Sequence, residues 1–232
     1  MISDNINSIR ERISRACARA GRSTSEITLL AVGKTFPSSA VREAVEAGVA
    51  DVGENYVQEL LSKRGDLSGS DVRWHFIGHL QSNKVKNVAP WIHMIHAVDS
   101  TALAIEIDRR AAKAGRVIEC LLEVNTTGES TKFGVAPGDV TALVRSLASC
   151  DNISLGGLMT IGPFLPDPEG SRPMFRRLRE LKDEIISLAQ ANVTMRHLSM
   201  GMTGDFEVAI DEGATLVRIG TGVFGPRTRA DH

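Results

Sequence analysis

The sequence predicts an α/β fold, a TIM-type (β/α)8 barrel with an extra N-terminal helix. Three observations support it. Eight short apolar segments alternate with helical patterns, the length of 232 residues suits one such barrel, and no Gly-x-Gly-x-x-Gly fingerprint follows the first strand. Strands that alternate with helices pair in parallel through right-handed crossovers, and eight of them close into a barrel, so a doubly wound open sheet ranks second. Without a repeat or a long linker, residues 1–232 are expected to form a single domain.

The composition narrows the classes of function. A formal net charge of −1 gives no electrostatic basis for binding nucleic acid or a membrane surface. The N-terminus lacks a basic-then-apolar signal, and no apolar run approaches membrane-spanning length. Three scattered cysteines, Cys17, Cys120 and Cys150, have neither Cys-x-x-Cys nor metal-ligand spacing. We therefore expect a cytoplasmic protein without a metal site.

The first element is an amphipathic helix. Its apolar residues recur at spacings of four, three, four and four positions: Ile2, Ile6, Ile9, Ile13 and Cys17. Ser3 or Asp4 stands near its start, and Gly21 closes it. Because this helix precedes the first strand, it is expected to pack on the outside of the barrel or to plug one end.

The first strand is the segment around which the chain is organised. Residues 27–32 are six apolar-leaning positions in a row, typical of a strand buried on both faces, and Gly33 and Lys34 follow directly. Pro37 ends the strand, and a helical pattern begins at 40–45. One amine therefore stands where a core strand runs out into a loop, which is where α/β barrels carry their chemistry.

The later elements continue the alternation of strand and helix. Strands are expected at 49–53, 72–78, 91–98, 117–124, 153–160, 195–199 and 215–220. Helices are expected from 54–61, from 79–84, at 102–111, about 139–149 and about 174–189, with a short helix around 206–210. A polar loop at 125–134 and a Pro/Gly-rich loop at 163–173 separate some of these elements.

Lys34 allows three interpretations. An amine held against apolar walls loses its proton more easily than an amine in water, and the free amine condenses with aldehydes. A solvated loop lysine is the plain alternative. A phosphate-binding Walker A loop is a weak third, because the residue five positions before Gly33 is Thr28 rather than glycine.

Polar residues recur directly after the predicted strands. They are Lys34, Asn55, His79, Asn125, Thr160, Ser199 and Arg218. In a closed barrel these residues meet at one face, and the first and last strands are neighbours. Lys34 is therefore expected beside Arg218 and near Ser199. Arg218 itself suits either a phosphate clamp or a structural ion pair.

The C-terminal stretch is rich in glycine. Six glycines fall between Ser199 and Pro226, at positions 201, 204, 213, 220, 222 and 225. Loops after strands seven and eight of barrels commonly form phosphate sites from backbone N–H groups, although ordinary turns would give the same pattern. A lysine that faces a phosphate cradle suits a phosphorylated aldehyde. Both pyridoxal 5′-phosphate (PLP) as a cofactor and a sugar phosphate cleaved through a Schiff base fit this description.

Six motifs carry a family resemblance. They are Ala31-Val32-Gly33-Lys34-Thr35, Gly53-Glu54-Asn55-Tyr56-Val57-Gln58-Glu59, Trp74-His75-Phe76-Ile77-Gly78-His79-Leu80-Gln81-Ser82-Asn83-Lys84, Gly157-Leu158-Met159-Thr160, Leu198-Ser199-Met200-Gly201-Met202 and Arg218-Ile219-Gly220-Thr221-Gly222-Val223-Phe224-Gly225. In order and extent they closely resemble the pyridoxal phosphate homeostasis protein family, which is related to the N-terminal domain of alanine racemase.

The resemblance implies a PLP-binding protein for intracellular homeostasis of the cofactor. Lys34 would hold PLP as an internal aldimine without strong catalytic turnover, so no catalytic residue is assigned. Arg218 would face the pyridine nitrogen, and Asn55 would lie near the ring. The phosphate would be held by Ser199, Gly201, Gly220 and Thr221. Apo PLP enzymes would be recipients of the cofactor, and the chain would be a monomer.

Weak turnover also follows from the residues. A guanidinium does not readily release a proton to the ring nitrogen, which leaves the ring a poor electron sink. A related racemase also needs a tyrosine base from a second domain, whereas Tyr56 is the only tyrosine here. A racemase-like PLP enzyme and a Schiff-base sugar-phosphate lyase are the alternative functions.

The sequence departs from the family pattern at a few positions. Gly33 replaces a common serine, and Phe36 stands where lysine is frequent. The sequence from Met202 to Asp205 differs from the usual Met-Ser-x-Asp, which argues against a phosphate role for Thr203. Lys132 and His79 have open roles, each as a contact of the cofactor or as an ordinary surface or packing residue.

Overall fold

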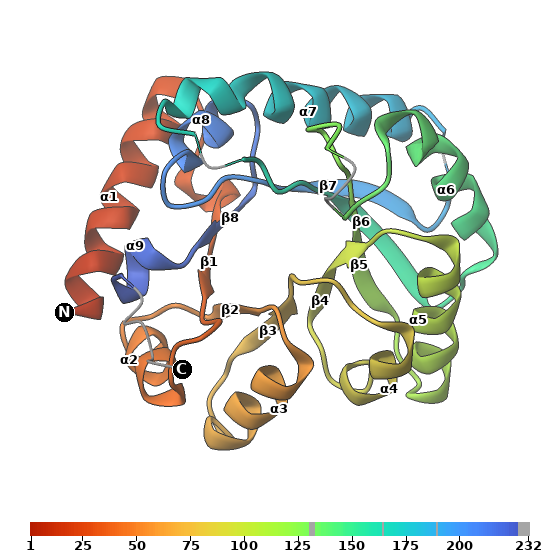
Figure 1. The fold of residues 1–232 in the computed structure, drawn as a ribbon, viewed down its shortest axis with the longest axis horizontal. Helices are drawn as coiled ribbons and strands as arrows, with labels where there is room; N and C mark the ends of the chain where they lie inside the picture. Colours follow the sequence, from red (N-terminus) through yellow and green to blue (C-terminus); the bar gives the residue numbers. More distant parts are fainter. Residues whose placement is uncertain (130–132, 164, 189, 227–232) are drawn as a thin grey trace.

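Eight parallel strands close into a barrel in the order in which they occur along the chain (Figure 1). The structure is a computed structural model that describes residues 1–129, 133–163, 165–188 and 190–226. The strands are β1 (Thr28–Val32), β2 (Asp51–Glu54), β3 (Arg73–Phe76), β4 (Met94–Val98), β5 (Ile118–Glu123), β6 (Ile153–Met159), β7 (Val193–Ser199) and β8 (Leu216–Ile219). Because β1 pairs with both β2 and β8, the barrel is closed, and the predicted fold class is confirmed.

Helices surround the barrel (Figure 1). They are α1 (Ile2–Ala20), α2 (Ser38–Glu46), α3 (Val57–Asp66), α4 (Val85–Val88), α5 (Thr101–Lys113), α6 (Val140–Ser146), α7 (Arg172–Ile186), α8 (Phe206–Asp211) and α9 (Thr221–Phe224). Within the described ranges, none of these helices combines the length and apolar character needed to cross a membrane.

Some boundaries differ from the sequence-based expectation. The helix expected from 79–84 is a 3-10 turn (Ser82–Lys84) followed by the short α4. Strand β4 begins at Met94 rather than at 91, because the N–H groups of Trp91 and Ile92 both donate to Val88 O and continue the turn after α4. Strand β7 begins at Val193, two residues before the predicted start.

The N-terminal helix packs on the outside of the barrel. Helix α1 contacts α8, α9 and α2, which decides between the two predicted positions (Figure 1). It ends at Gly21, whose left-handed φ of 65° is the conformation that favours glycine. Arg12 lies 4.5 Å over the Phe206 ring and donates to Glu207 at 2.7 Å, which adds polar contacts to the seam between α1 and α8.

A substitution on the buried face of α1 is expected to lower stability. Ile6 is fully buried in the main hydrophobic core. Ile6→Ala should reduce the free energy of unfolding by about 2–5 kcal/mol, because it removes buried carbon and leaves a cavity. Ile105, which is largely exposed on α5, provides the matched control, and Ile105→Ala should change stability by less than about 0.5 kcal/mol. Urea denaturation measures both, and equal effects would contradict this account of α1.

The barrel interior contains apolar and polar side chains. Two apolar clusters lie apart from the main core, one of Met94, Ala97, Leu121, Met159 and Leu216, the other of Leu30, Val32 and Ile77. Buried polar side chains from the strands include His75, His96 and Arg218. Buried polar groups need hydrogen-bond partners, so the barrel interior must contain hydrogen bonds between side chains as well as apolar contacts.

Candidate functional site

Lys34 lies in a tight turn directly after β1. The N–H of Phe36 donates to Gly33 O at 3.0 Å, which closes the turn around Lys34 and Thr35. Thr35 has a φ of 68°, a left-handed conformation that β-branched residues rarely adopt. Its N–H donates to Glu59 Oε2 at 2.9 Å, which offsets part of the strain. The turn holds Lys34, partly buried, at the C-terminal end of the barrel.

The buried side chain of Lys63 holds the backbone of this turn by a hydrogen bond. Lys63 Nζ donates to Gly33 O at 2.8 Å, to Glu54 Oε1 at 2.8 Å and to Glu59 Oε2 at 3.0 Å. Burial raises the pKa of Glu54 to about 7, although the hydrogen bond from Lys63 opposes this shift. Lys63 therefore connects the backbone next to Lys34 with two carboxyl groups.

Gly33 leaves the space that the Glu54 carboxyl group occupies. A Cβ atom at position 33 would lie 2.7 Å from Glu54 Oε1 and 3.0 Å from Val41 Cγ2. Real Cβ contacts are essentially never shorter than about 3 Å, so a side chain here requires Glu54 to move. The resembling family commonly has serine at this position, and a serine here would need only a shift of the flexible Glu54 side chain and a slight adjustment of Val41.

Arg218 is fixed inside the barrel beside Ser199. Its Nη1 donates to Ser199 Oγ at 2.6 Å, and its Nη2 donates to Thr160 O at 2.7 Å. Burial lowers the pKa of Arg218 to about 10, with Glu123 and Asp205 opposing the shift, so the group stays cationic at neutral pH. Ser199 and Arg218, both of which were expected near Lys34, are thus in direct contact with each other.

Thr203 brings the loops after β7 and β8 together. Its Oγ1 accepts hydrogen bonds from Gly222 N and from Thr221 Oγ1, both at 3.2 Å. Backbone N–H groups and hydroxyls gathered at a helix start are the donors that phosphate oxygens prefer. The structure therefore brings Thr203 into the predicted phosphate region, although its sequence context argued against that role.

The predicted glycines differ in their surroundings. Gly201 has a φ of 92°, and a Cβ there would lie 2.6 Å from Ala209 Cβ and 2.9 Å from Phe206 Cα, so this glycine permits close packing against α8. Gly220 precedes α9 and lies beside the end of β1, since a Cβ on it would be 3.6 Å from Val32 O.

The lysine turn and the C-terminal loops occupy the same end of the barrel. Gly220 lies next to Val32, two residues before Lys34. Phe36 from the lysine turn packs on Phe224 of α9, with ring centroids 4.9 Å apart. These contacts join the two predicted walls of the site. The phenylalanine at position 36, a departure from the family pattern, thus makes an apolar contact where the family often has a charge.

Asn55 follows β2 and carries an orphaned polar atom. Its Oδ1 is buried and has no hydrogen-bond partner within the described part of the chain. Asn55 also lines a cavity of about 450 Å³, together with His79 and Glu123. A buried amide oxygen without a protein partner is an acceptor that a water or a molecule bound in this cavity can satisfy.

His79 stands at the outer rim of this cavity. Its ring stacks on Phe133 at 4.2 Å between centroids, and its Nδ1 lies 3.3 Å from Asp99 Oδ2. These contacts describe a rim residue. Lys132, whose role the sequence left open, lies outside the residues that the structure describes.

Sequence reasoning missed several buried polar residues of the barrel. They are Glu54, Lys63, His75, His96 and Glu123. Except for Lys63, which lies on α3, their shared signal is an ionisable side chain within a short, mainly apolar strand, as for His96 in Met94–Val98. In a barrel such a residue points either to the interior or to the helices, and both directions are apolar environments that require a partner.

Glu123 is expected to make stability depend on pH. Burial, with a smaller contribution from Asp99, raises the pKa of Glu123 to about 7. A carboxyl group with a raised folded-state pKa stabilises the fold below pH of about 4.5, and this contribution is lost as the pH rises through about 7. From pH 5 to 8, the free energy of unfolding of the wild type relative to Glu123→Gln should fall by on the order of 2–3 kcal/mol. Thermal or urea denaturation across this range measures the difference, and a pH-independent difference would refute the prediction.

The fold and the site define a class of barrel that carries a lysine after its first strand and glycine-containing loops after its seventh and eighth strands. Residues 5–228 match the family described as "Alanine racemase, N-terminal domain". Curated relatives named "Pyridoxal phosphate homeostasis protein" match nearly end to end, and this chain belongs to that family. The relative from Aquifex aeolicus is 48% identical over 224 residues, covering 97% of each chain, and the one from Pseudomonas aeruginosa is 42% identical over 226 residues, covering 97% of this chain and 96% of the relative.

Solved structures agree with this assignment. PipY of Synechococcus elongatus, described with PLP bound, superposes with a TM-score of 0.85 at 33% identity, covering 97% of this chain and all of PipY. Alanine racemase from Clostridium difficile has a TM-score of 0.75 at 15% identity, and this chain covers 58% of it. The second similarity concerns the barrel fold alone.

Proposed function

We propose that this chain binds PLP covalently through Lys34 and serves the homeostasis of that cofactor without strong catalytic turnover. The observation that carries the proposal is the position of the Lys34 turn at the same end of the barrel as the loops of Thr203, Gly220 and Thr221. The names of the curated relatives and the PLP-bound PipY structure support the same cofactor.

The residues present fit this group. PLP combines an aldehyde, a phosphate and an aromatic ring with a nitrogen acceptor. Lys34 supplies the amine, and the Arg218 guanidinium supplies a donor for the ring nitrogen. The Thr203 hydroxyl, which accepts from Thr221 Oγ1 and Gly222 N, keeps its own hydrogen to donate to the phosphate, and binding of the phosphate would let Thr221 and Gly222 N turn from Thr203 to its oxygens. The buried Asn55 Oδ1 is available to accept a hydrogen bond from the bound cofactor. The predicted phosphate contacts of Gly201 and Gly220 remain part of this proposal, and Ser199 enters it through its hydrogen bond with Arg218.

The same residues suit binding better than turnover. Bound PLP supplies an electron-withdrawing ring. Arg218 stays protonated and donates without giving up its proton, which keeps the ring nitrogen unprotonated and limits that withdrawal. Tyr56, the only tyrosine, is 58% exposed at the start of α3 and is poorly placed as a buried base. We therefore propose that turnover is weak.

A titration with PLP tests binding. Purified protein should develop a visible absorbance band that saturates at one equivalent, and borohydride followed by peptide mass analysis should locate the adduct on Lys34. Protein that stays without a visible band under excess PLP would overturn the proposal. An adduct formed only with a sugar phosphate would instead favour the lyase.

Exchange of amino-acid α-protons in deuterated water tests turnover. The PLP-loaded protein is expected to exchange the α-proton of common amino acids no faster than free PLP does. The control mixture contains free PLP and an unrelated protein that does not bind it. Rapid, stereospecific exchange or racemisation would support the racemase-like alternative and overturn the proposal of weak turnover.

We further propose a single-domain, monomeric, cytoplasmic protein that supplies PLP to apo enzymes. The three cysteines are buried as free thiols, which suits a reducing compartment. Reactivation of an apo PLP enzyme by the loaded protein, in the presence of a scavenger for free PLP, tests direct delivery. Reactivation that disappears with the scavenger would argue for release into solution. Light scattering tests the oligomeric state.

A further inference from the structure

A chain of hydrogen-bonded side chains crosses the barrel interior. Asp51 Oδ1 lies 2.9 Å from His75 Nε2, His75 Nδ1 lies 2.9 Å from His96 Nε2, and His96 Nδ1 lies 2.9 Å from Ser199 Oγ. Arg218 Nη1 completes it at 2.6 Å from Ser199 Oγ. All five residues are buried, and they come from β2, β3, β4, β7 and β8.

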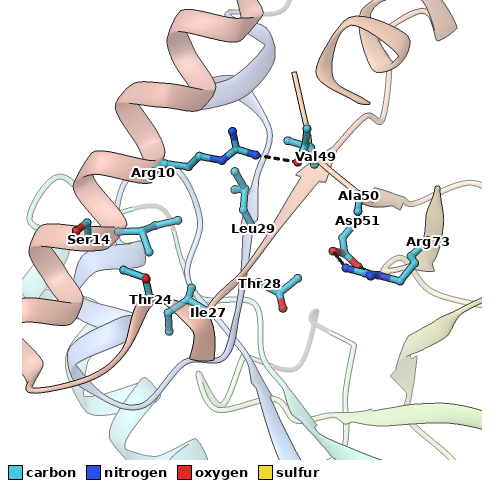
Figure 2. Close-up of a pocket in the computed structure, with 12 residues that line it drawn as sticks. Arg10, Ser14, Thr24, Ile27, Thr28, Leu29, Val49, Ala50, Asp51 and Arg73 are labelled. Carbon is cyan, nitrogen blue, oxygen red and sulfur yellow. Dashed lines mark hydrogen bonds and ion pairs between the residues drawn. The ribbon is translucent and has the colours of Figure 1, made fainter. Parts of the chain in front are cut away.

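The far end of this chain is anchored by an ion pair. Arg73 Nε donates to Asp51 Oδ1 at 2.8 Å, and Arg73 Nη2 donates to Asp51 Oδ2 at 2.5 Å. Both residues stand at the starts of their strands, at the wall of a cavity of about 540 Å³ on the N-terminal side of the barrel (Figure 2). The chain therefore connects the N-terminal end of the barrel with the proposed cofactor site.

The two ends determine the direction of every hydrogen bond between them. A guanidinium only donates, so Arg218 donates to Ser199. Burial alone would raise the pKa of Asp51, but hydrogen bonds from His75 and Arg73 outweigh it and lower the pKa to about 2. Asp51 is then an ionised, acceptor-only group at neutral pH.

The imidazoles between these ends are neutral. Burial lowers the pKa of His75 and of His96, the nearby Asp51 opposing the shift for His75 and the nearby Arg218 reinforcing it for His96. His93 and His197, which also face His96 electrostatically, act in the same direction. A neutral imidazole has one donor and one acceptor, so the protons run from Ser199 to His96, from His96 to His75 and from His75 to Asp51. Both rings carry the proton on Nε2.

This direction of the hydrogen bonds uses the one hydrogen of the Ser199 hydroxyl. Its single hydrogen is donated to His96 Nδ1, and its oxygen accepts from Arg218. Ser199 therefore has no hydrogen left for a phosphate oxygen. Its contribution to the site is to hold the guanidinium, together with Thr160 O.

We propose that His96 and His75 are positioning residues that hold Ser199 and, through it, Arg218 in place at the cofactor ring. This inference rests on the proposed function, because the ring is that of PLP. Removing the His96 nitrogens frees the Ser199 hydroxyl to rotate, and one of the two partners of Arg218 loses its fixed orientation. A substitution nearer to Asp51 should disturb Arg218 less, because each residue of the chain acts on Arg218 only through the residues between them.

A metal ion is a poorer explanation of the same residues. Single ligand atoms of Asp51, His75 and His93 lie within 4.8 Å of one another. However, Arg73 bonds both carboxylate oxygens of Asp51, and His75 Nε2 carries the proton in the chain. A cation would have to displace the Arg73 guanidinium and the proton on His75 Nε2. The hydrogen-bonded chain requires neither change.

Nitrogen NMR of the wild-type protein tests the direction of the chain. With ¹⁵N-labelled histidine, both His75 and His96 should show a protonated Nε2 and an unprotonated Nδ1 at neutral pH. A protonated Nδ1 on either ring overturns the proposal. This measurement needs no PLP, so its outcome is separate from that of the proposed function.

PLP titration of variants tests the positioning role. His96→Phe keeps the ring size and should bind PLP about tenfold more weakly with a shifted absorbance maximum, because about 1.4 kcal/mol corresponds to tenfold. His75→Phe should weaken binding about threefold. His96→Asn, which keeps an acceptor for Ser199, should restore most of the affinity and the wild-type spectrum.

His197→Phe is the matched control, since His197 lies outside the chain and pairs with Glu119. It should leave affinity and spectrum unchanged. If His96→Phe loses thermal stability but keeps the wild-type affinity and spectrum, the histidines are only packing residues and the proposal is overturned. A wild-type protein without the visible band would overturn the proposed function itself, and this is seen before any variant is compared.

Discussion

Lys34→Ala is expected to abolish the visible absorbance band of the PLP-loaded protein. The band requires a covalent bond between the amine of Lys34 and the aldehyde carbon, and alanine has no amine. The variant should retain weaker, non-covalent binding, because the donors around Thr203 and Arg218 are unchanged. Visible spectroscopy, together with mass analysis after borohydride, measures the loss.

Lys86→Ala is the matched control for this prediction. Lys86 is exposed on α4, away from the lysine turn, so its loss should leave the band and the PLP affinity unchanged. A normal band in Lys34→Ala would place the covalent bond on another lysine, and the assignment of the site to the end of β1 would then be wrong. Fold stability should change little in either variant, which circular dichroism checks.

Lys63→Met is expected to destabilise the protein by about 3–5 kcal/mol. The substitution leaves Glu54 buried without its charged partner, and breaking a buried ion pair from one side costs about that much. It also removes the donor to Gly33 O, the backbone group beside Lys34. PLP affinity should therefore fall together with stability. Urea denaturation and PLP titration measure the two effects.

A double variant separates the ion pair from the loss of packing. Adding Glu54→Gln to Lys63→Met replaces the unpaired carboxyl group by a neutral amide, so stability should recover by about half. The exposed substitution Lys86→Met should have an effect below about 0.5 kcal/mol. If Lys63→Met is as stable as the wild type, the buried pair makes no net contribution and the account of the turn is incorrect.

Much of the fold and part of the site were predictable from the sequence, for a physical reason. Strand–helix alternation sets parallel topology, and closure of the barrel brings the end of the first strand beside the last one. The strands that lead to Lys34 and carry Arg218 are therefore neighbours, which needs no knowledge of side-chain contacts. The N-terminal helix was likewise recognisable from one apolar stripe, but its position outside the barrel required the structure.

The rest depends on which way individual side chains point. His96 is the single polar residue of β4, and His75 shares β3 with Arg73; the sequence does not say whether either histidine faces the interior or the helices. Lys63 lies on α3 among polar neighbours and resembles a solvated residue until the helix is packed on the barrel. Ser199 was predictable as a site residue, whereas its inward hydrogen bonds follow only from the register of β7 and β8.

The close approach of Gly33 and Glu54 has an evolutionary consequence. A Cβ atom at position 33 would lie 2.7 Å from Glu54 Oε1, the far end of a flexible side chain, so a larger residue at 33 requires this carboxyl group to turn aside. Lineages with a side chain at 33 are therefore expected to keep glutamate at 54 in a different rotamer. A side chain next to the reactive lysine can then be gained in a single substitution, without an earlier change at 54.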